Sequence, residues 1–291
     1  MKSIRKIISI LVVAVLLQAS CFILVIHAAN VDNQNTIYIS TAQELINLAT
    51  RVNSGENLEG VTVELLNDID LNCSEDNPWV PIGKDENNRF EGDFDGKGFS
   101  IINMYISNIE KVYNQSNEWY YGYAGLFGYA TGTIKNLVIK DSRINVKEKG
   151  KQHTYIGIIS GTVNKIECCR TENCSIITTV EESEGFYFDI GGVIGSATNV
   201  NGVSNTTNIT FENKTDPYYH QNYIGGIVGY CSHGTLEDCY NLGNINVPYT
   251  AGAVGGIAGD SYGEIKNCFN IGSISTQGEA NYNCQRNSVE L

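Results

Sequence analysis

Cysteine is the residue type whose number first suggests chemistry in this 291-residue chain, which contains nine cysteines and four histidines. Three of the cysteines, Cys168, Cys169 and Cys174, lie close together in the sequence. They lack the paired C-x-x-C spacing of a structural zinc site, and no histidine is near them. The sequence therefore predicts no metal site.

Acidic residues form a second cluster that could carry chemistry. Asp68 and Asp70 share one face of an expected strand, and Asp93, Asp95 and Gly96 form a carboxylate-rich turn. Such residues could bind calcium or cleave a glycan as an acid pair. They could equally cap turns on a solvated face. The stretch lacks the full calcium-loop pattern, so the sequence assigns it no catalytic, cofactor-binding or metal-binding residue.

Tyrosine is abundant, at 17 residues, and exposed tyrosines could stack on sugars or on a protein partner. The tyrosine pairs Tyr120-Tyr121 and Tyr218-Tyr219 are the best surface candidates, because each lies just before a glycine-rich core segment. We expect Tyr120, Tyr121, Tyr218 and Tyr219 to be ligand-binding aromatics. The alternative is that they pack at corners or cover edges.

Overall charge restricts the class of partner. The chain has a formal charge of -13 and a pI near 4.7, and it has no cluster of Lys or Arg outside its first six residues. Nucleic acid is therefore excluded as a partner, because binding phosphates needs a basic face.

The first 28 residues resemble a targeting segment. Lys2, Arg5 and Lys6 precede an apolar run from Ile7 to Ile26, and Ala28 and Ala29 offer small residues for cleavage. We expect a signal peptide over residues 1–28 and a secreted or cell-surface location. Two alternatives stay open, an uncleaved membrane anchor and lipidation at Cys21, and only the uncleaved segment would bring the chain to a membrane.

Residues 29–112 are expected to form an N-terminal capping block of strands and one helix. A strand at 37–39 precedes a helix that begins with the capping-box pair Thr41 and Glu44. Further strands are expected at 61–66, 69–71 and 99–106.

From residue 113 to residue 280 the chain repeats itself. Five segments share an apolar–glycine core, and their closing glycines, Gly128, Gly161, Gly195, Gly229 and Gly259, are spaced by 33, 34, 34 and 30 residues. Two further landmarks follow each core. The first is an aliphatic residue with a small or apolar one three positions later, at Ile134/Leu137, Ile166/Cys169, Val203/Thr206, Leu236/Cys239 and Ile265/Cys268. The second is a short β-rich piece that starts at Ile144, Ile176, Ile209, Ile245 and Ile274.

Each unit therefore holds about three short strands separated by turns, and none has a helical period. Such a unit cannot bury its apolar face alone, whereas stacked units can. The sequence predicts an all-β protein, a parallel, right-handed β-helix-like solenoid of about five coils. Insertions at 147–152 and 212–221 would bulge from corners, and residues 281–291 would form a tail or an incomplete coil.

The repeat alignment gives the cysteines a second role. Cys169, Cys239 and Cys268 occupy one repeat position and would form a ladder in the core. They could be small buried hydrophobic side chains. Alternatively, Cys239 and Cys268 could form a disulfide between adjacent coils, although parallel side-chain vectors strain its dihedral angle.

These repeats resemble the GLUG-motif repeats of bacterial surface and secreted proteins. The name-giving core is Gly-Leu-any-Gly, here 125–128, and fuller units run over 223–245 and 254–274. The leading block also looks like the segment that precedes such repeats. The resemblance implies a β-helical, extracytoplasmic module and supplies no catalytic residue. Some such repeats sit beside zinc proteases, but no histidine here fits the H-E-x-x-H signature.

Three functions remain in competition. The first is a non-catalytic module for adhesion or binding, with an extracellular glycan or protein as ligand and no cofactor. The second is a β-helical carbohydrate-active enzyme that uses acidic residues in a groove. The third is a structural stalk fragment of a larger surface protein.

Overall fold

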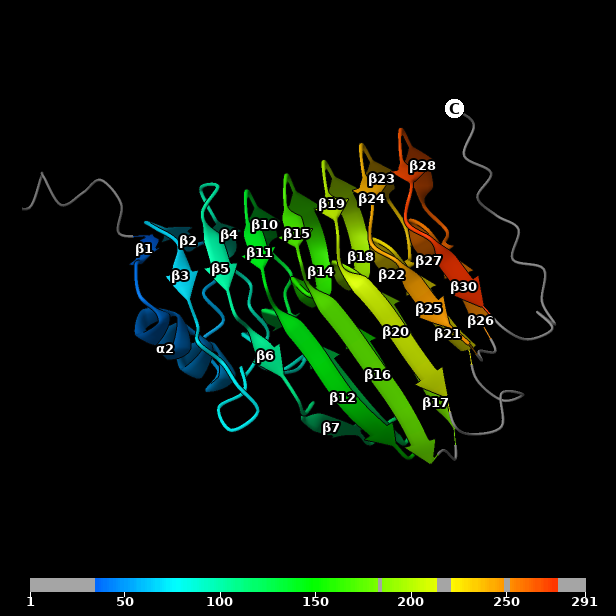
Figure 1. Ribbon diagram of the computed structural model, residues 1–291. Coiled ribbons are helices and arrows are strands. Elements are labelled where there is room, and N and C mark those ends of the chain that lie inside the picture. The colour runs from blue at the N-terminus through cyan, green and yellow to red at the C-terminus, as the bar shows by residue number, and fades with distance from the viewer. Residues whose placement is uncertain (1–34, 183–184, 214–220, 249–251, 277–291) are drawn as a thin grey trace, which may run out of the picture. The chain divides into compact units, whose positions relative to one another are not determined.

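The large unit of the protein is a β-solenoid. A computed structural model describes residues 35–182, 185–213, 221–248 and 252–276. The chain divides into a short unit, Met1–Thr36, and a large one, Ile37–Leu291. In the large unit the chain winds through successive coils whose equivalent strands pair (Figure 1). This confirms the predicted all-β parallel solenoid with one helix. The expected signal peptide (1–28) and tail (281–291) lie outside the described residues.

The strands of the described residues form four sheets, which we number in the order that a coil passes through them. Sheet 1 contains β7 (Lys111–Asn114), β8 (Trp119–Ala124), β13 (Gln152–Ile156), β17 (Phe186–Gly191), β21 (Gln221–Gly225) and β26 (Gly252–Gly255). Sheet 2 contains β1 (Thr36–Ile39), β2 (Thr62–Leu65), β4 (Asp93–Asp95), β9 (Phe127–Tyr129), β10 (Thr133–Lys135), β14 (Ser160–Glu167), β18 (Ile194–Asn201), β22 (Val228–Cys231), β23 (Thr235–Glu237), β27 (Ala258–Ser261) and β28 (Glu264–Lys266).

Sheets 3 and 4 complete each coil. Sheet 3 contains β3 (Ile69–Asp70), β5 (Ser100–Ile102), β11 (Val138–Lys140), β15 (Arg170–Glu172), β19 (Ser204–Asn205), β24 (Tyr240–Asn241) and β29 (Phe269–Asn270). Sheet 4 contains β6 (Tyr105–Ile106), β12 (Arg143–Lys149), β16 (Ser175–Glu182), β20 (Asn208–Asn213), β25 (Ile245–Val247) and β30 (Ile274–Thr276). Strands of neighbouring coils pair in parallel, whereas β7 and β8 pair antiparallel.

The expectation of three strands per repeat was wrong, because each coil contributes to four sheets. Residues with positive φ occur at the corners between sheets 2 and 3 and, in the earlier coils, at the corners between sheets 3 and 4. At the first corner these include Asn136 (φ 52°) and Asp238 (φ 54°), and at the second Asn103 (φ 58°) and Asp141 (φ 48°). Asn and Asp tolerate this left-handed conformation better than other residues with side chains. The expected strand 99–106 is consequently split at Asn103 into β5 and β6.

The predicted bulge at 147–152 holds only for its later part, because the register of β12 against β16 shifts between Glu148 and Lys149. Lys147 and Glu148 extend β12 and pair in register with Thr179 and Val180 of β16. The neighbouring strands β16 and β20 are long in the same place (Figure 1), so the additional residues make ladder hydrogen bonds instead of leaving the sheet.

The register of the strands corrects one repeat landmark and supports the others. Ile144, Ile176, Ile209, Ile245 and Ile274 are successive partners in sheet 4, as aligned from the sequence. In sheet 2, however, Ile166 pairs with Val200 and Val200 with Leu236. The third pair is therefore Val200/Val203 and not Val203/Thr206. Both pairs have the same spacing, and the sequence pattern could not separate them.

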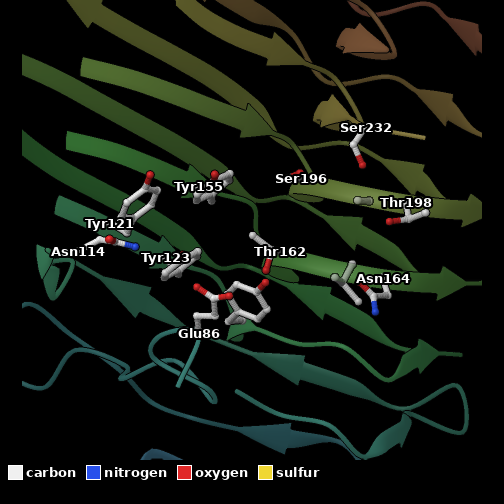
Figure 2. A pocket seen from close by; sticks show the side chains of 13 residues that line it. Glu86, Asn114, Tyr121, Tyr123, Tyr155, Thr162, Asn164, Ser196, Thr198 and Ser232 are labelled. Carbon is white, nitrogen blue, oxygen red and sulfur yellow. The ribbon is translucent and has the colours of Figure 1, made fainter. Parts of the chain in front are cut away.

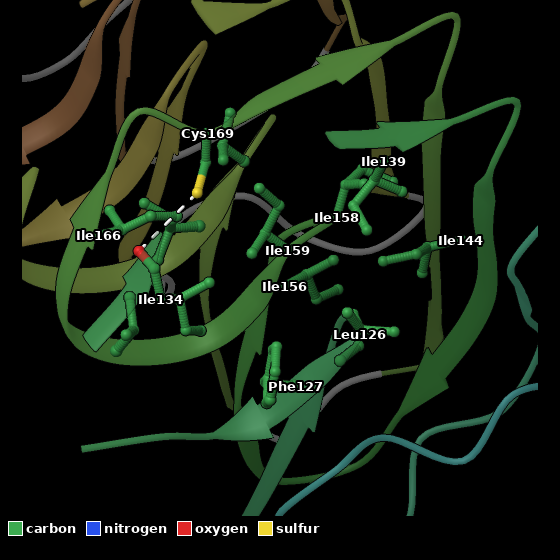
Figure 3. Packing of buried hydrophobic residues seen from close by; sticks show 14 of the residues in the cluster. Leu126, Phe127, Ile134, Ile139, Ile144, Ile156, Ile158, Ile159, Ile166 and Cys169 are labelled. Atoms are coloured by element: carbon green, nitrogen blue, oxygen red, sulfur yellow. Dashed lines mark hydrogen bonds between the residues drawn. The ribbon is translucent and has the colours of Figure 1, made fainter. Parts of the chain in front are cut away.

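The inside of each coil is filled by aliphatic and aromatic side chains. Figure 3 shows Leu126, Ile139, Ile158 and their neighbours pointing into the space between the sheets. These side chains are almost completely buried, with Leu126, Ile139 and Ile158 each 0% exposed. Apolar burial on this scale is the main favourable term in folding.

Asparagine replaces the aliphatic residue in the later coils. Asn205, Asn241 and Asn270 are successive register partners in sheet 3, and Asn205 and Asn241 are fully buried. Asn205 Nδ2 donates to Asn241 Oδ1 at 2.7 Å, and Asn241 Nδ2 donates to Asn270 Oδ1 at 2.7 Å. The second amide hydrogen of each goes to a backbone carbonyl, for example that of Gly226 or Gly243. We call this row the asparagine ladder.

The second glycine of each core motif makes room for this ladder. A Cβ at Gly226 would lie 2.4 Å from Asn241 Cγ, and a Cβ at Gly256 would lie 2.4 Å from Asn270 Cγ. Real Cβ atoms do not approach other atoms so closely, so a glycine is required opposite each asparagine. In the first two coils, Leu126 and Ile158 take the place of that glycine, and the ladder position holds Ile139 and Thr171. The variation of the motif therefore reflects an exchange of side-chain volume across the core.

The N-terminal helix begins with the capping box expected from the sequence. It runs over Ala42–Asn53 (α2) and begins with Thr41 and Glu44 bonded as a capping box. Its buried face is formed by Leu45, Leu48, Ala49 and Val52. The strands that follow α2 join sheets 2 and 3 of the coils, so the leading block continues the same sheets.

Cys239 and Cys268 lie in adjacent coils at one register position, just before the paired Tyr240 and Phe269. Both are free, buried thiols, and Cys169 is a buried free thiol as well. Hydrogen bonding between the two thiols raises the pKa of Cys239 and lowers that of Cys268. The disulfide between them stays a prediction.

The asparagine ladder gives a test of stability. Asn241→Ala removes both ladder bonds of one member and leaves the buried Asn205 and the partly buried Asn270 each without one hydrogen-bond partner. We expect the free energy of unfolding to fall by about 2–3 kcal/mol. Asn246→Ala, on the exposed face of β25, is the matched control and is expected to change it by less than about 0.5 kcal/mol. Urea unfolding measures both, and equal effects would show that the ladder is not a stabilising network.

The thiol pair gives a second test. Stacked Cα atoms about 4.8 Å apart are within the range of a disulfide. After mild oxidation, we expect mass spectrometry without reduction to find a peptide cross-link between Cys239 and Cys268. Cys169 is the internal control, because its register neighbours are Leu137 and Val203. Full alkylation of Cys239 and Cys268 before reduction would contradict the prediction.

Candidate functional site

Sheets 1 and 2 meet at a corner where the core motifs recur. The closing glycines lie at this corner: a Cβ at Gly195 would lie 2.6 Å from Ile156 N and 2.8 Å from Asp189 O. Glycine therefore lets the strands of the two sheets approach backbone to backbone. Side chains from both sheets line a groove of about 340 Å³ beside this corner (Figure 2).

One side of the groove is a tyrosine row on sheet 1. Tyr123 of β8 pairs in register with Tyr155 of β13, and the row continues through Asp189 to Tyr223. The Tyr123 and Tyr155 rings stack in parallel, with centroids 5.2 Å apart and planes 4° apart. Tyr121 lies two residues before Tyr123 and lines the groove as well.

The other side of the groove is a row on sheet 2. Tyr129, Thr162, Ser196 and Tyr230 are successive register partners in β9, β14, β18 and β22. The middle of this row carries small hydroxyl side chains, whereas both ends carry tyrosines. Asn164, Thr198 and Ser232 add a second polar row, and Figure 2 shows them with Ser196 along the groove.

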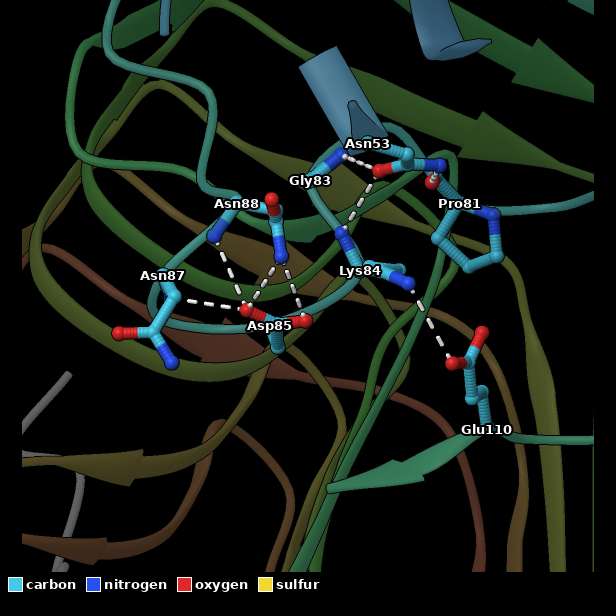
Figure 4. Close-up of polar contacts among 8 residues, drawn as sticks. All are labelled: Asn53, Pro81, Gly83, Lys84, Asp85, Asn87, Asn88 and Glu110. Atoms are coloured by element: carbon cyan, nitrogen blue, oxygen red, sulfur yellow. Dashed lines mark hydrogen bonds and ion pairs between the residues drawn. The ribbon is translucent and has the colours of Figure 1, made fainter. Parts of the chain in front are cut away.

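A loop after α2 adds a carboxylate at one end of the groove. Glu86 lines the groove, and its loop is held by the buried Asp85. Asp85 Oδ1 accepts hydrogen bonds from the backbone N–H groups of Asn87 and Asn88, at 2.8 and 2.9 Å (Figure 4). Asn53, the last residue of α2, accepts from the backbone N–H of Gly83. The helix therefore positions the loop that presents Glu86.

The groove tyrosines are protonated at physiological pH, as an ordinary phenol is. Burial raises the pKa of Tyr123, Tyr155 and Tyr129 above that ordinary value, and nearby carboxylates raise it further. Burial likewise raises the pKa of Tyr223 to about 12. At physiological pH each phenol is therefore a neutral group that can both donate and accept a hydrogen bond.

A histidine–aspartate pair lies on the same face of sheet 1 as the tyrosine row. His153 Nε2 is 3.2 Å from Asp189 Oδ2, and the His153 ring stacks on Tyr155 at 4.3 Å. The Asp189 side chain is 3% exposed, and its Oδ1 has no hydrogen-bond partner among the described residues. Burial raises the pKa of this carboxyl, and the interaction with His153 opposes the rise.

The four tyrosines predicted from the sequence as ligand-binding residues do not lie together in one described site. Tyr121 lines the groove, and its hydroxyl accepts a hydrogen bond from Asn117 Nδ2 at 2.7 Å. Tyr120 is 46% exposed and pairs with Tyr113 instead, at a ring separation of 5.0 Å. Neighbouring residues of a strand point to opposite faces, so Tyr120 and Tyr121 cannot serve one site. Tyr218 and Tyr219 lie outside the described residues. Ligand binding by Tyr121 stays a prediction.

The sequence reasoning missed most of the groove. Tyr155 was visible as the first residue of a repeat core, in the same place as Tyr123, and this recurrence was the available signal. Thr162 and Ser196 carried no such signal, because single hydroxyl residues are common in strands. Glu86 was not predictable, because its place depends on how α2 holds the loop.

The acidic residues identified from the sequence accept hydrogen bonds at turns and corners of the coils. Asp68 accepts from the backbone N–H of Ser100 at 2.7 Å, and Asp93 from that of Thr133 at 2.8 Å. Asp70 and Asp95 accept from Asn103 and Asn136, the left-handed corner residues of the next coil. These carboxylates therefore connect coils. No group of three or more His, Cys, Asp or Glu side chains suited to a metal ion occurs within the described ranges.

Comparisons with known proteins give two partial likenesses. No protein-family profile matches the chain. A Gly-rich membrane protein of Evansella cellulosilytica is 33% identical over 119 residues, which are 39% of this chain and 12% of that protein. A solved structure from Bacteroides ovatus, described as an immunoglobulin A1 protease, is similar with a TM-score of 0.43 and 16% identity, over 83% of this chain and 77% of that one.

The first likeness fits a glycine-rich repeat protein, and the match spans only a small part of the relative. The helix in the described part of this chain is too short to cross a membrane.

The buried carboxyl predicts a pH dependence. Because the folded-state pKa of Asp189 is raised, the native state prefers the protonated form, and its ionisation opposes folding as the pH rises through that pKa. We expect Asp189→Asn to stabilise the protein relative to wild type at pH 8 and to lose this advantage as the pH falls below about 4. Urea unfolding across this range measures the difference.

The matched control is Asp76→Asn, which changes an exposed carboxyl in a loop. It is expected to leave the free energy of unfolding within about 0.5 kcal/mol of wild type at each pH. A destabilisation by Asp189→Asn that is largest at pH 8 would show that ionised Asp189 is stabilised by His153 more than it is opposed by burial.

Proposed function

We propose that this protein is a secreted or cell-surface β-solenoid module of the GLUG-repeat type, and that it binds an extracellular glycan or protein without catalysis. The observation that carries the proposal is the groove between sheets 1 and 2. Its volume of about 340 Å³ falls in the usual range for ligand sites, about 300–1,000 Å³. Its lining draws side chains from several coils, so it is a property of the stacked repeats.

The repeats support the GLUG assignment through their glycines. The closing glycines at the corner of sheets 1 and 2 and the glycines opposite the asparagine ladder are the motif positions that the close approach of the backbone requires. The likeness to a glycine-rich membrane protein agrees with an extracytoplasmic repeat. The basic and apolar pattern of residues 1–28 supports export of the chain.

The composition of the groove favours binding over turnover. Its lining contains one carboxylate, Glu86, together with tyrosine, serine, threonine and asparagine side chains. Hydrolysis of a glycoside by the usual route uses a pair of carboxyl groups on either side of the bond. The second carboxyl nearby, Asp189, is the buried register partner of Tyr155 and is not among the residues that line the groove.

An array of glycans and host proteins tests this function with the purified protein. We expect binding without release of new reducing ends. Thr198→Trp places a large ring in the groove and is expected to weaken binding at least tenfold. Thr210→Trp, on the outer face of β20 in sheet 4, is the matched control and should bind as wild type.

Three outcomes would contradict the proposal. Release of reducing ends from a polysaccharide would favour a carbohydrate-active enzyme. Equal binding by Thr198→Trp and wild type would remove the groove from the function. Absence of binding to every arrayed glycan and protein would favour a structural stalk.

A further inference from the structure

We infer that the groove takes a neutral polysaccharide segment that lies along the solenoid axis. The inference rests on the proposed binding function and adds the chemical class, the direction and the length of the ligand. Its evidence is the polarity of the lining, its charge, its repeat spacing and the state of the backbone around it.

The lining is polar and both donates and accepts hydrogen bonds. Ser196 and Thr198 of β18 and Ser232 after β22 present hydroxyls, and Asn114 and Asn164 present amides. The phenols of Tyr123 and Tyr155 are neutral at physiological pH, and burial raises their pKa further. The Tyr123 ring already stacks on Tyr155 and contacts Tyr129 edge-on at 5.2 Å. The ring faces of these tyrosines are therefore largely occupied, and the serine and threonine hydroxyls and the amides of the lining suit a ligand covered with hydroxyls.

The charge of the groove excludes acidic ligands. Glu86 is the charged residue in its described lining, which contains no Lys or Arg. Asp260, the register partner of Tyr230, adds a second negative charge beyond the end of the row. An acidic glycan would bring like charges together in a partly desolvated place, which is unfavourable. A neutral sugar has no such cost.

The spacing of the lining gives the ligand a direction. The same type of position recurs once per coil, at about 4.8 Å, the distance between neighbouring strands. From Tyr129 of β9 to Ser232 after β22 the lining crosses three such steps, so the groove extends about 14 Å along the axis. A ligand that repeats along its own length can place equivalent hydroxyls on successive coils. A linear oligosaccharide of about three rings would fill this length, at about one ring per strand spacing.

The backbone around the groove argues against an extended peptide. Peptides bind sheets by adding a strand to a free edge. β13 is paired on both sides, with β8 and β17, and β18 is paired with β14 and β22. The groove therefore lies over the faces of continuous sheets, where no row of free backbone groups is offered. Recognition has to come from side chains, as it does for sugars.

Titration calorimetry of the purified protein with linear neutral oligosaccharides of one to six rings tests the inference. The probes are glucan, mannan, galactan and xylan series, with uronic-acid oligomers as the acidic comparison. We expect at least one neutral series to bind, with an affinity that rises up to about three rings and then levels off. The acidic oligomers should bind at least tenfold more weakly, and Glu86→Gln should reduce this difference.

Variants without a groove hydroxyl locate the binding. Thr198→Val and Ser196→Ala should each weaken the neutral ligand about three- to tenfold, the effect of one lost hydrogen bond. Thr210→Val on the outer face of β20 keeps the fold and is expected to bind as wild type. Thermal unfolding of each variant separates loss of binding from loss of the fold.

Several outcomes would overturn the inference. Acidic oligomers that bind as tightly as neutral ones, an affinity without length dependence, or full affinity in both hydroxyl variants would each do so. If the array finds a protein ligand that Thr198→Trp blocks while no neutral oligosaccharide binds, the proposed binding function stands and the polysaccharide inference fails. If Thr198→Trp weakens the binding of no ligand, the groove is not the binding site, and both the proposed function and the polysaccharide inference fail.

Discussion

The close approach of backbones at glycine is the constraint on which this solenoid depends. At two places in each of the later coils a glycine faces atoms that leave no space for a Cβ. One is the closing glycine at the corner of sheets 1 and 2, as at Gly195, and the other is the glycine opposite the asparagine ladder, as at Gly226. The first lets the two sheets meet closely beside the groove. The second leaves room for a buried amide whose hydrogen bonds join one coil to the next.

The buried amides show how the core accepts polar groups. A polar side chain inside a protein is costly unless its hydrogen bonds are made. Asn241 meets this requirement because identical residues lie directly above and below it, and because backbone carbonyls such as that of Gly243 accept the remaining hydrogens. Stacking in register thus satisfies the hydrogen bonds of a buried amide, and it makes the stability of the core depend on the correct register. It also penalises any slip of one coil against another, since a shifted asparagine would lose the amide partner of the next coil.

Much of the fold could be predicted from the sequence, because it follows from short sequence patterns within each repeat. Three features depend on a short sequence pattern. They are the spacing of the closing glycines, the capping box at Thr41 and the isoleucines that start the strands of sheet 4. The number of sheets could not be predicted in the same way. Strands such as β19 and β24 are two residues long, and the left-handed residues at corners, such as Asn136 and Asp141, give no periodic pattern of apolar side chains.

The groove was less predictable than the fold, because its residues come together only through stacking. Tyr121 was identified from its place before a repeat core, and the same reasoning chose Tyr120, which points to the other face. Ser196 and Thr198 are unremarkable in the sequence and gain their place from the register of β18 against its neighbours. Glu86 belongs to a loop that is held by hydrogen bonds to Asp85 and to Asn53, the last residue of a helix about thirty residues earlier in the chain.

The asparagine ladder also bears on how such a protein can change its length. Each coil with a glycine and an asparagine offers its neighbour the same amide donor and acceptor, so one more coil of this kind would fit between two others without a new type of contact. A gene duplication of one repeat within this stretch would then lengthen the solenoid by about 4.8 Å and add one more row to the face that the groove occupies. Between Thr171 and Asn205 the two kinds of coil meet through a hydroxyl–amide contact. This junction is where inserted coils would have to match two different neighbours, and where duplication would be tolerated least.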